Sequence, residues 1–187
     1  MTGDYMKVLI VVGSRREGNS FVLANKLKTS LENARIANDI IIPGNQKIYL
    51  CTGCMDCDRN GVCDFKDDMV ANIEKVTSSD YIVFITPVRW DLLSGDLKIF
   101  MDRLNPLFST RQMKGKKMIA IIVGSKKRTE YSTDGALTSL GSFASSAGMS
   151  LVYSSQFDEC LNFGDVLKYE DKINKMCEDI IKLIDSE

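Results

Sequence analysis

The chain has 187 residues, 24 Lys and Arg against 25 Asp and Glu, and a formal net charge of −1. This balance excludes the basic footprint of a nucleic-acid-binding protein, and no apolar run reaches the roughly 18 residues that a membrane-spanning helix needs. The sequence contains no histidine, which excludes histidine-based acid–base chemistry and triads and leaves any catalysis to a bound cofactor.

The length fits a single domain, 1–187, that is large enough to fold without disulfides or a structural metal. The N-terminus lacks the basic-then-apolar pattern of a signal peptide, so we expect a cytoplasmic protein. In a reducing cytoplasm, clustered cysteines are metal ligands or redox groups more often than disulfides.

The predicted elements alternate between strand and helix. Lys7–Val12 is a continuous branched apolar run, typical of a buried parallel strand, and Phe21–Leu31 carries leucines at helical spacing. Further strands are expected at 40–42, 81–85, 118–123 and, shorter, 150–154, and further helices at about 67–76, 94–104, 134–147 and 166–184. This alternation predicts an α/β fold with a doubly wound parallel sheet and helices on both faces, and five strands favour the flavodoxin-like order 2-1-3-4-5.

The loop after the first strand, 13–20, is a candidate phosphate site. Ligands of such sheets bind at the carboxyl ends of the strands, and here the loop leads into a helix N-terminus with free N–H groups. A glycine permits close backbone approach, while hydroxyl, amide and guanidinium groups can donate to phosphate oxygens. The candidate ligands are Ser14, Arg16, Gly18, Asn19 and Ser20. The alternative is that Asn19 or Ser20 only caps the helix.

Two further loops follow the third and fourth strands. Backbone amides of the first could bond a flat heterocycle, with candidate residues Pro87, Val88, Arg89 and Trp90. Trp90 would border the heterocycle, pack the loop as an anchor, or lie at a subunit interface. In the second loop, Gly124 permits close approach of a ligand to the backbone. Three cations follow it, Lys126, Lys127 and Arg128, which either attract the phosphates of a nicotinamide cofactor or form solvated surface.

A cysteine-rich loop at about 50–66 carries four cysteines within thirteen residues, spaced C-x2-C-x2-C-x5-C: Cys51, Cys54, Cys57 and Cys63. Four thiolates in one loop suit the corners of a [4Fe–4S] cluster, and C-x2-C-x2-C opens a ferredoxin-type run. Structural zinc sites usually draw their ligands from two separated pairs, so zinc is less favoured. Free thiols that oxidise to disulfides are the remaining alternative.

Three segments together resemble the flavodoxin-like NAD(P)H-dependent FMN reductases, and within them the iron–sulfur flavoproteins. They read G-S-R-R-E-G-N-S at 13–20, C-T-G-C-M-D-C before C-D-F-K-D-D-M within 51–69, and P-V-R before S-G-D-L-K-I-F-M-D-R within 87–103. The resemblance implies FMN, with its phosphate in the first loop and its ring against the second. It also implies a cluster on the four cysteines and a homodimer or homotetramer. Arg89 stands where the family usually has tyrosine, which affects the expected surroundings of the ring.

We therefore expect an FMN-dependent oxidoreductase. Hydride would arrive from NAD(P)H at flavin N5, so no side chain is expected to be catalytic, and electrons would pass to a flavin, quinone or similar small acceptor. One alternative is an electron carrier in which a ferredoxin-like protein feeds a [4Fe–4S] cluster and FMN. Another is a non-enzymatic thiol redox sensor. The cysteines decide between these branches, whereas the flavin interpretation holds without them.

Overall fold

The computed structural model describes residues 6–127 and 133–186. Five parallel strands form one sheet in the order β2-β1-β3-β4-β5, which confirms the predicted flavodoxin-like order. The strands are β1 (Lys7–Val12), β2 (Ala37–Ile41), β3 (Tyr81–Pro87), β4 (Lys117–Val123) and β5 (Ser150–Phe157).

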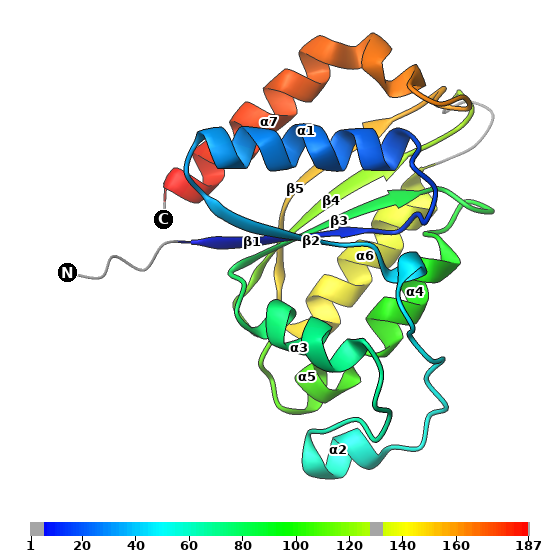
Figure 1. Cartoon of the computed structure of the whole chain (residues 1–187), viewed down its shortest axis with the longest axis vertical. Coiled ribbons are helices and arrows are strands. Elements are labelled where there is room, and N and C mark those ends of the chain that lie inside the picture. The colour runs from blue at the N-terminus through cyan, green and yellow to red at the C-terminus, as the bar shows by residue number, and fades with distance from the viewer. Residues whose placement is uncertain (1–5, 128–132, 187) are drawn as a thin grey trace.

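Helices cover both faces of this sheet (Figure 1). One face carries α1 (Asn19–Asn33) and α7 (Glu170–Asp185), and the other carries α3 (Met69–Thr77), α4 (Gly95–Asp102), α5 (Asn105–Ser109) and α6 (Asp134–Ala147). Short 3-10 turns lie at η1 (Pro43–Asn45) and η2 (Asp165–Tyr169). The cysteine-rich loop contains one short helix, α2 (Asp56–Asn60), beside α5 and away from the sheet.

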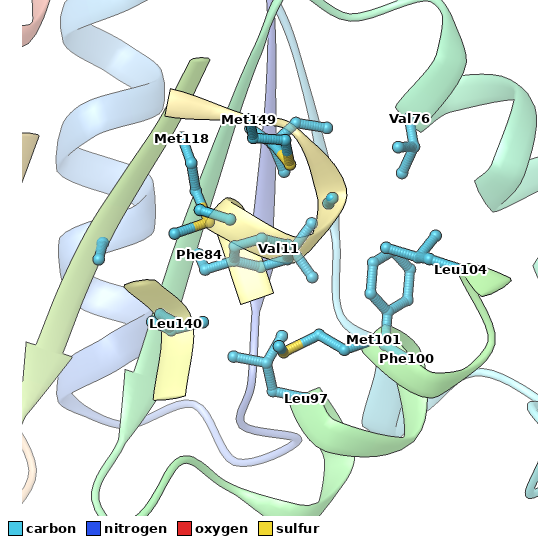
Figure 2. Close-up of a cluster of buried hydrophobic side chains, with 14 of the residues drawn as sticks. Val11, Val76, Phe84, Leu97, Phe100, Met101, Leu104, Met118, Leu140 and Met149 are labelled. Carbon is cyan, nitrogen blue, oxygen red and sulfur yellow. The ribbon is translucent and has the colours of Figure 1, made fainter. Parts of the chain in front are cut away.

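The continuous apolar strands form this fold because the sheet is buried on both faces. Along β1, Val8 and Ile10 join the core under α1 and α7, whereas Leu9 and Val11 join the core under α4 and α6. Figure 2 shows the second core, in which side chains of the central strands meet inward-facing side chains of the helices: Val11, Phe84, Met118, Leu97, Met101 and Leu140.

Several predicted boundaries differ from the structure. The helix predicted at 94–104 ends at Asp102, and a separate α5 begins at Asn105 with Pro106 in its first turn, where proline is tolerated. The helix predicted at 166–184 is η2 followed by α7. The strand predicted as short at 150–154 runs to Phe157, because its polar residues still pair with β4 along its length.

Within residues 6–127 and 133–186, no helix combines the length and the apolarity that crossing a membrane requires.

Candidate functional site

The loop between β1 and α1 leaves the start of α1 open to an anion. Gly18 is the N-cap with extended backbone, no side chain caps the helix, and no acidic residue stands in its first turn. The Ser14 hydroxyl and the Gly18 N–H both donate to the Arg16 carbonyl, at 3.2 Å and 2.8 Å, which folds the loop tightly. Uncapped N–H groups and the helix dipole together suit a phosphate.

Among the predicted phosphate ligands, Asn19 has a different role. Its Nδ2 donates to the carbonyls of Cys160 and Asn162 at 2.9 Å and 2.8 Å, and its Oδ1 accepts from the Val166 N–H at 3.2 Å. The buried amide thus ties the loop after β5 to α1 and has no N–H left for a phosphate, contrary to the prediction. Its backbone N–H stays in the first turn of α1, next to buried Ser20, whereas the Arg16 side chain is exposed.

The loop between β1 and α1 lies against the N-terminus of α4, as the strand order predicts. A Cβ at Gly13 would lie 2.7 Å from Ser94 Oγ and 2.9 Å from Leu97 Cβ, so only glycine permits this approach. Arg15 of the same loop pairs with Asp96 in the first turn of α4, with Nη2–Oδ1 at 2.6 Å. The loops after β1 and β3 are therefore direct neighbours.

Substitution of Gly13 by alanine is expected to lower the free energy of unfolding by about 1–3 kcal/mol, the usual cost of overpacking a close contact. Gly95→Ala is the matched control, because a Cβ there would meet nothing within 4 Å. Urea denaturation monitored by circular dichroism measures both variants. Equal denaturation midpoints for the two variants would mean that a side chain at position 13 is tolerated against α4.

The loop after β3 forms a tight two-residue turn. Arg89 N–H donates to the Leu92 carbonyl at 2.8 Å, and Leu92 N–H donates back at 3.0 Å. The residues between them, Trp90 and Asp91, have φ of 50° and 60°, values that such turns normally reserve for asparagine, aspartate and glycine. Trp90 is 90% exposed, so the interpretation that it packs the loop as an anchor is wrong. Strained backbone of this kind tends to occur at functional sites.

This turn borders a pocket of about 290 Å³ at the carboxyl ends of β3 and β4, lined by Val88, Arg89, Trp90, Gly124, Ser125, Lys126 and Thr133. The pocket thus brings four of the five predicted ring-site residues together, while Pro87 ends β3 just before it. The Thr133 hydroxyl is buried and has no hydrogen-bond partner in the described part of the chain. Lys126 and Lys127 are exposed, and Arg128 lies outside the described residues.

The four cysteines line one small pocket of about 30 Å³, together with Phe65, Arg103 and Asn105. Cys51 and Cys54 are exposed, Cys63 is half-buried, and Cys57 is buried in α2. A hydroxyl on α5 fixes α2, since Ser109 Oγ donates to the Cys57 carbonyl at 2.8 Å. Within 6–127 and 133–186, no three Cys, Asp or Glu side chains lie close enough together to hold a metal ion.

A buried ion pair forms the inner wall of the cysteine pocket. The side chains of Arg103 and Asp67 are 1% and 0% exposed, and Arg103 donates to both Asp67 oxygens, at 2.6 Å and 3.0 Å. Arg103 also donates to the Tyr49 carbonyl at 2.7 Å and stacks 4.9 Å from the Phe65 ring centroid. Asp67 lies just before α3, where a carboxylate can cap the helix. It does accept from the Met69 N–H at 3.1 Å, but its main partner is Arg103.

The helix α4 connects the two candidate sites. At its start, the N-cap Ser94 and Asp96 contact the loop between β1 and α1. At its other end, Arg103 follows the last residue and lines the cysteine pocket. Eight residues at 1.5 Å per residue give α4 a length of about 12 Å. The two candidate sites therefore lie at opposite ends of one short helix.

The two cysteines outside the loop are buried. Burial raises the pKa of Cys177 and raises that of Cys160 to about 11, so neither thiol is a reactive thiolate near neutral pH. Cys177 packs in the core under α1 and α7, and Cys160 Sγ donates to the Asp158 carbonyl at 3.1 Å.

Comparisons with known proteins identify the family of the chain. A family model described as NADPH-dependent FMN reductase matches residues 6–157. An iron–sulfur flavoprotein of Methanocaldococcus jannaschii is 31% identical over 123 residues, which is 65% of this chain and 64% of that protein. Another, of Archaeoglobus fulgidus, is 31% identical over 119 residues, 63% of this chain and 54% of that protein. The matches therefore span less than two thirds of these relatives' lengths.

Among solved structures, an FMN-dependent NADH-azoreductase from Bacillus anthracis in complex with FMN superposes with a TM-score of 0.68. It is 13% identical, and the match covers 95% of this chain and 99% of that one. A likeness at this identity shows the flavodoxin-like fold alone.

Proposed function

This chain belongs to the NADPH-dependent FMN reductase family, and we propose that it is an FMN-dependent oxidoreductase with a second redox site on its cysteine loop. The observation that carries the proposal is that the loop between β1 and α1 and the pocket lined by the four cysteines lie at opposite ends of α4. The curated relatives named iron–sulfur flavoprotein support this branch of the family.

The residues at the carboxyl ends of β1, β3 and β4 fit FMN. The uncapped N–H groups at the start of α1 would hold the phosphate, and the pocket beside Trp90 and Gly124 would hold the ring. When bound, FMN supplies the N5 atom at which a hydride arrives from NAD(P)H and from which its two electrons leave to an acceptor. Arg89, on the wall of the ring pocket, would stabilise negative charge on the ring by its own positive charge.

The chain's contribution to this reaction is to bind and orient. The Thr133 hydroxyl is buried and without a hydrogen-bond partner among the described residues, so it would offer a donor to a polar edge of the ring. The strained turn holds Trp90 and Arg89 beside the same pocket. The exposed indole of Trp90 leaves one side of the pocket open, so a nicotinamide cofactor and a small acceptor such as a flavin or quinone would approach in turn from there.

The cysteine loop supports a second candidate function, electron transfer through a [4Fe–4S] cluster fed by a ferredoxin-like protein. Four thiols facing one pocket are the donor set that such a cluster takes. No three of the described ligands lie close enough together to hold a metal ion. Binding of a cluster would therefore require the exposed Cys51 and Cys54 to move toward the inner pair, Cys57 and Cys63. A thiol redox sensor is the third candidate. The proposal includes a cytoplasmic homodimer or homotetramer.

Anaerobic mixing of the FMN-loaded protein with NADH or NADPH tests the reductase function. We expect either nucleotide to bleach the visible flavin band, and added quinone or free flavin to restore it with repeated turnover. Reduction by a chemically reduced ferredoxin but by neither nucleotide would favour the electron carrier. A flavin that no donor reduces, together with thiol-dependent changes in assembly, would favour the sensor.

A further inference from the structure

Two side-chain donors point at sulfur atoms of the cysteine pocket. Arg103 Nη2 donates to Cys63 Sγ at 3.4 Å, and Asn105 Nδ2 donates to Cys57 Sγ at 3.1 Å. Both donors come from the end of α4 and the start of α5, outside the cysteine loop itself. The sulfur atoms of Cys57 and Cys63 therefore accept hydrogen bonds from residues outside the cysteine loop.

These donors are held in place. Arg103 is clamped by both Asp67 oxygens, by the Tyr49 carbonyl and by the Phe65 ring, so its guanidinium cannot turn away from the pocket. The second hydrogen bond of Asn105, to Asp58 Oδ1 at 2.9 Å, fixes its amide in the same way. Donors that are oriented in advance act at full strength because they need no reorganisation.

Arg103 also has an unused donor. Its Nε is buried and has no hydrogen-bond partner among the described residues, although the guanidinium lines the pocket. A buried N–H without an acceptor is costly, and native proteins usually satisfy such groups. A sulfur-rich ligand in the pocket would offer the acceptor that the described residues do not supply.

We propose that Arg103 and Asn105 are positioning residues that raise the reduction potential of a cluster held by the four cysteines. This inference rests on the proposed cluster and concerns its electronic tuning. Reduction adds one negative charge to the cluster, and N–H donors to its ligating sulfurs stabilise the reduced form more than the oxidised form. The buried positive charge of Arg103 acts in the same direction.

The test is a redox titration of the reconstituted protein, followed by electron paramagnetic resonance, with Asn105→Ala as the main variant. Loss of one donor is expected to weaken reduction about tenfold, a downward shift of about 59 mV for a one-electron couple. Ser109→Ala is the matched control, because it removes a bond to the Cys57 carbonyl and leaves the sulfur untouched. Its potential is expected to equal that of the unchanged protein.

Arg103→Lys is a second variant for the same potential measurement, because it keeps the positive charge but loses the guanidinium N–H groups. A lowered potential in this variant also supports the proposal, and if it does not fold, Asn105→Ala decides alone. Iron and sulfide content distinguishes failure of the proposed cluster site from failure of the proposed tuning role. An unchanged protein that never takes up a cluster overturns the proposed cluster site. A loaded Asn105→Ala variant with an unshifted potential, or one that loses the cluster while Ser109→Ala keeps it, overturns the tuning role.

Discussion

Replacing Asp67 with asparagine is expected to lower the free energy of unfolding by about 3–5 kcal/mol, because it leaves the Arg103 guanidinium buried without a counter-charge. The two side chains are 0% and 1% exposed, so water cannot compensate the loss. A cost of this size is a large part of the total stability of a domain, which is about 5–15 kcal/mol. The same change is expected to loosen the inner wall of the cysteine pocket.

The neighbouring carboxylate provides the control. Asp68 is exposed and accepts one hydrogen bond, from the Lys47 N–H at 2.7 Å, so Asp68→Asn is expected to cost at most about 1 kcal/mol. Chemical denaturation at neutral pH measures both variants. Equal losses for the two would mean that Asp67 has only the capping role that its sequence position suggests.

The pH dependence of stability gives a second test of the same pair. Burial alone would raise the pKa of Asp67, but hydrogen bonds from Arg103 and from the N–H groups of Tyr49 and Met69 outweigh it and lower the pKa below its ordinary value. A carboxyl with a lowered folded-state pKa stabilises the protein above its unfolded pKa of about 3.9 and loses that contribution as pH falls through the lower folded value. Denaturation midpoints of Asp67→Asn should therefore vary less with pH in this acidic range.

Alanine at Gly135 is expected to weaken flavin binding about tenfold or more. A Cβ at this position, in the first turn of α6, would lie 2.1 Å from the Asp91 carbonyl oxygen. The contact is with backbone, so the turn containing Trp90 and Asp91 must move outward and displace a wall of the ring pocket. Overpacking of this kind costs about 1–3 kcal/mol. Fluorescence titration of the apoprotein with FMN measures the loss.

Gly141 offers a control in the same helix. The nearest atom that a Cβ there would meet is Leu151 Cδ2, at 3.9 Å. Gly141→Ala is therefore expected to stabilise the helix by about 0.5–1 kcal/mol and to leave the affinity for FMN unchanged. If both alanine variants bind FMN as the unchanged protein does, the turn at 89–92 is not part of the flavin site.

The sequence is sufficient to predict the sheet and the loops at its carboxyl ends. Continuous apolar runs such as Lys7–Val12 identify the central strands, and the rules for doubly wound sheets then bring the loops after β1 and β3 together. The contact of Gly13 with Ser94 follows from this order. The edge strand is less visible, because Ser154 and Ser155 interrupt its apolar pattern.

Interactions between distant residues account for what the sequence does not reveal. Asp67 and Arg103 are 36 positions apart, and each satisfies a local rule on its own, as a helix cap and as a cation at a helix end. The amide of Asn19 donates to carbonyls more than 140 positions away, so the local sequence around it, which suits a phosphate ligand, does not reveal its partners. A signal was present for Arg103, since D-D-M and D-R both belong to the resembling segments.

The most direct test of the account is the FMN, iron and sulfide content of protein purified without oxygen and reconstituted. Two sites at the ends of α4 predict one FMN and one [4Fe–4S] cluster per chain. Flavin without iron would remove the cluster and the tuning role of Arg103 and Asn105, and would leave the reductase. A chain that binds neither FMN nor any other flavin would contradict the central claim.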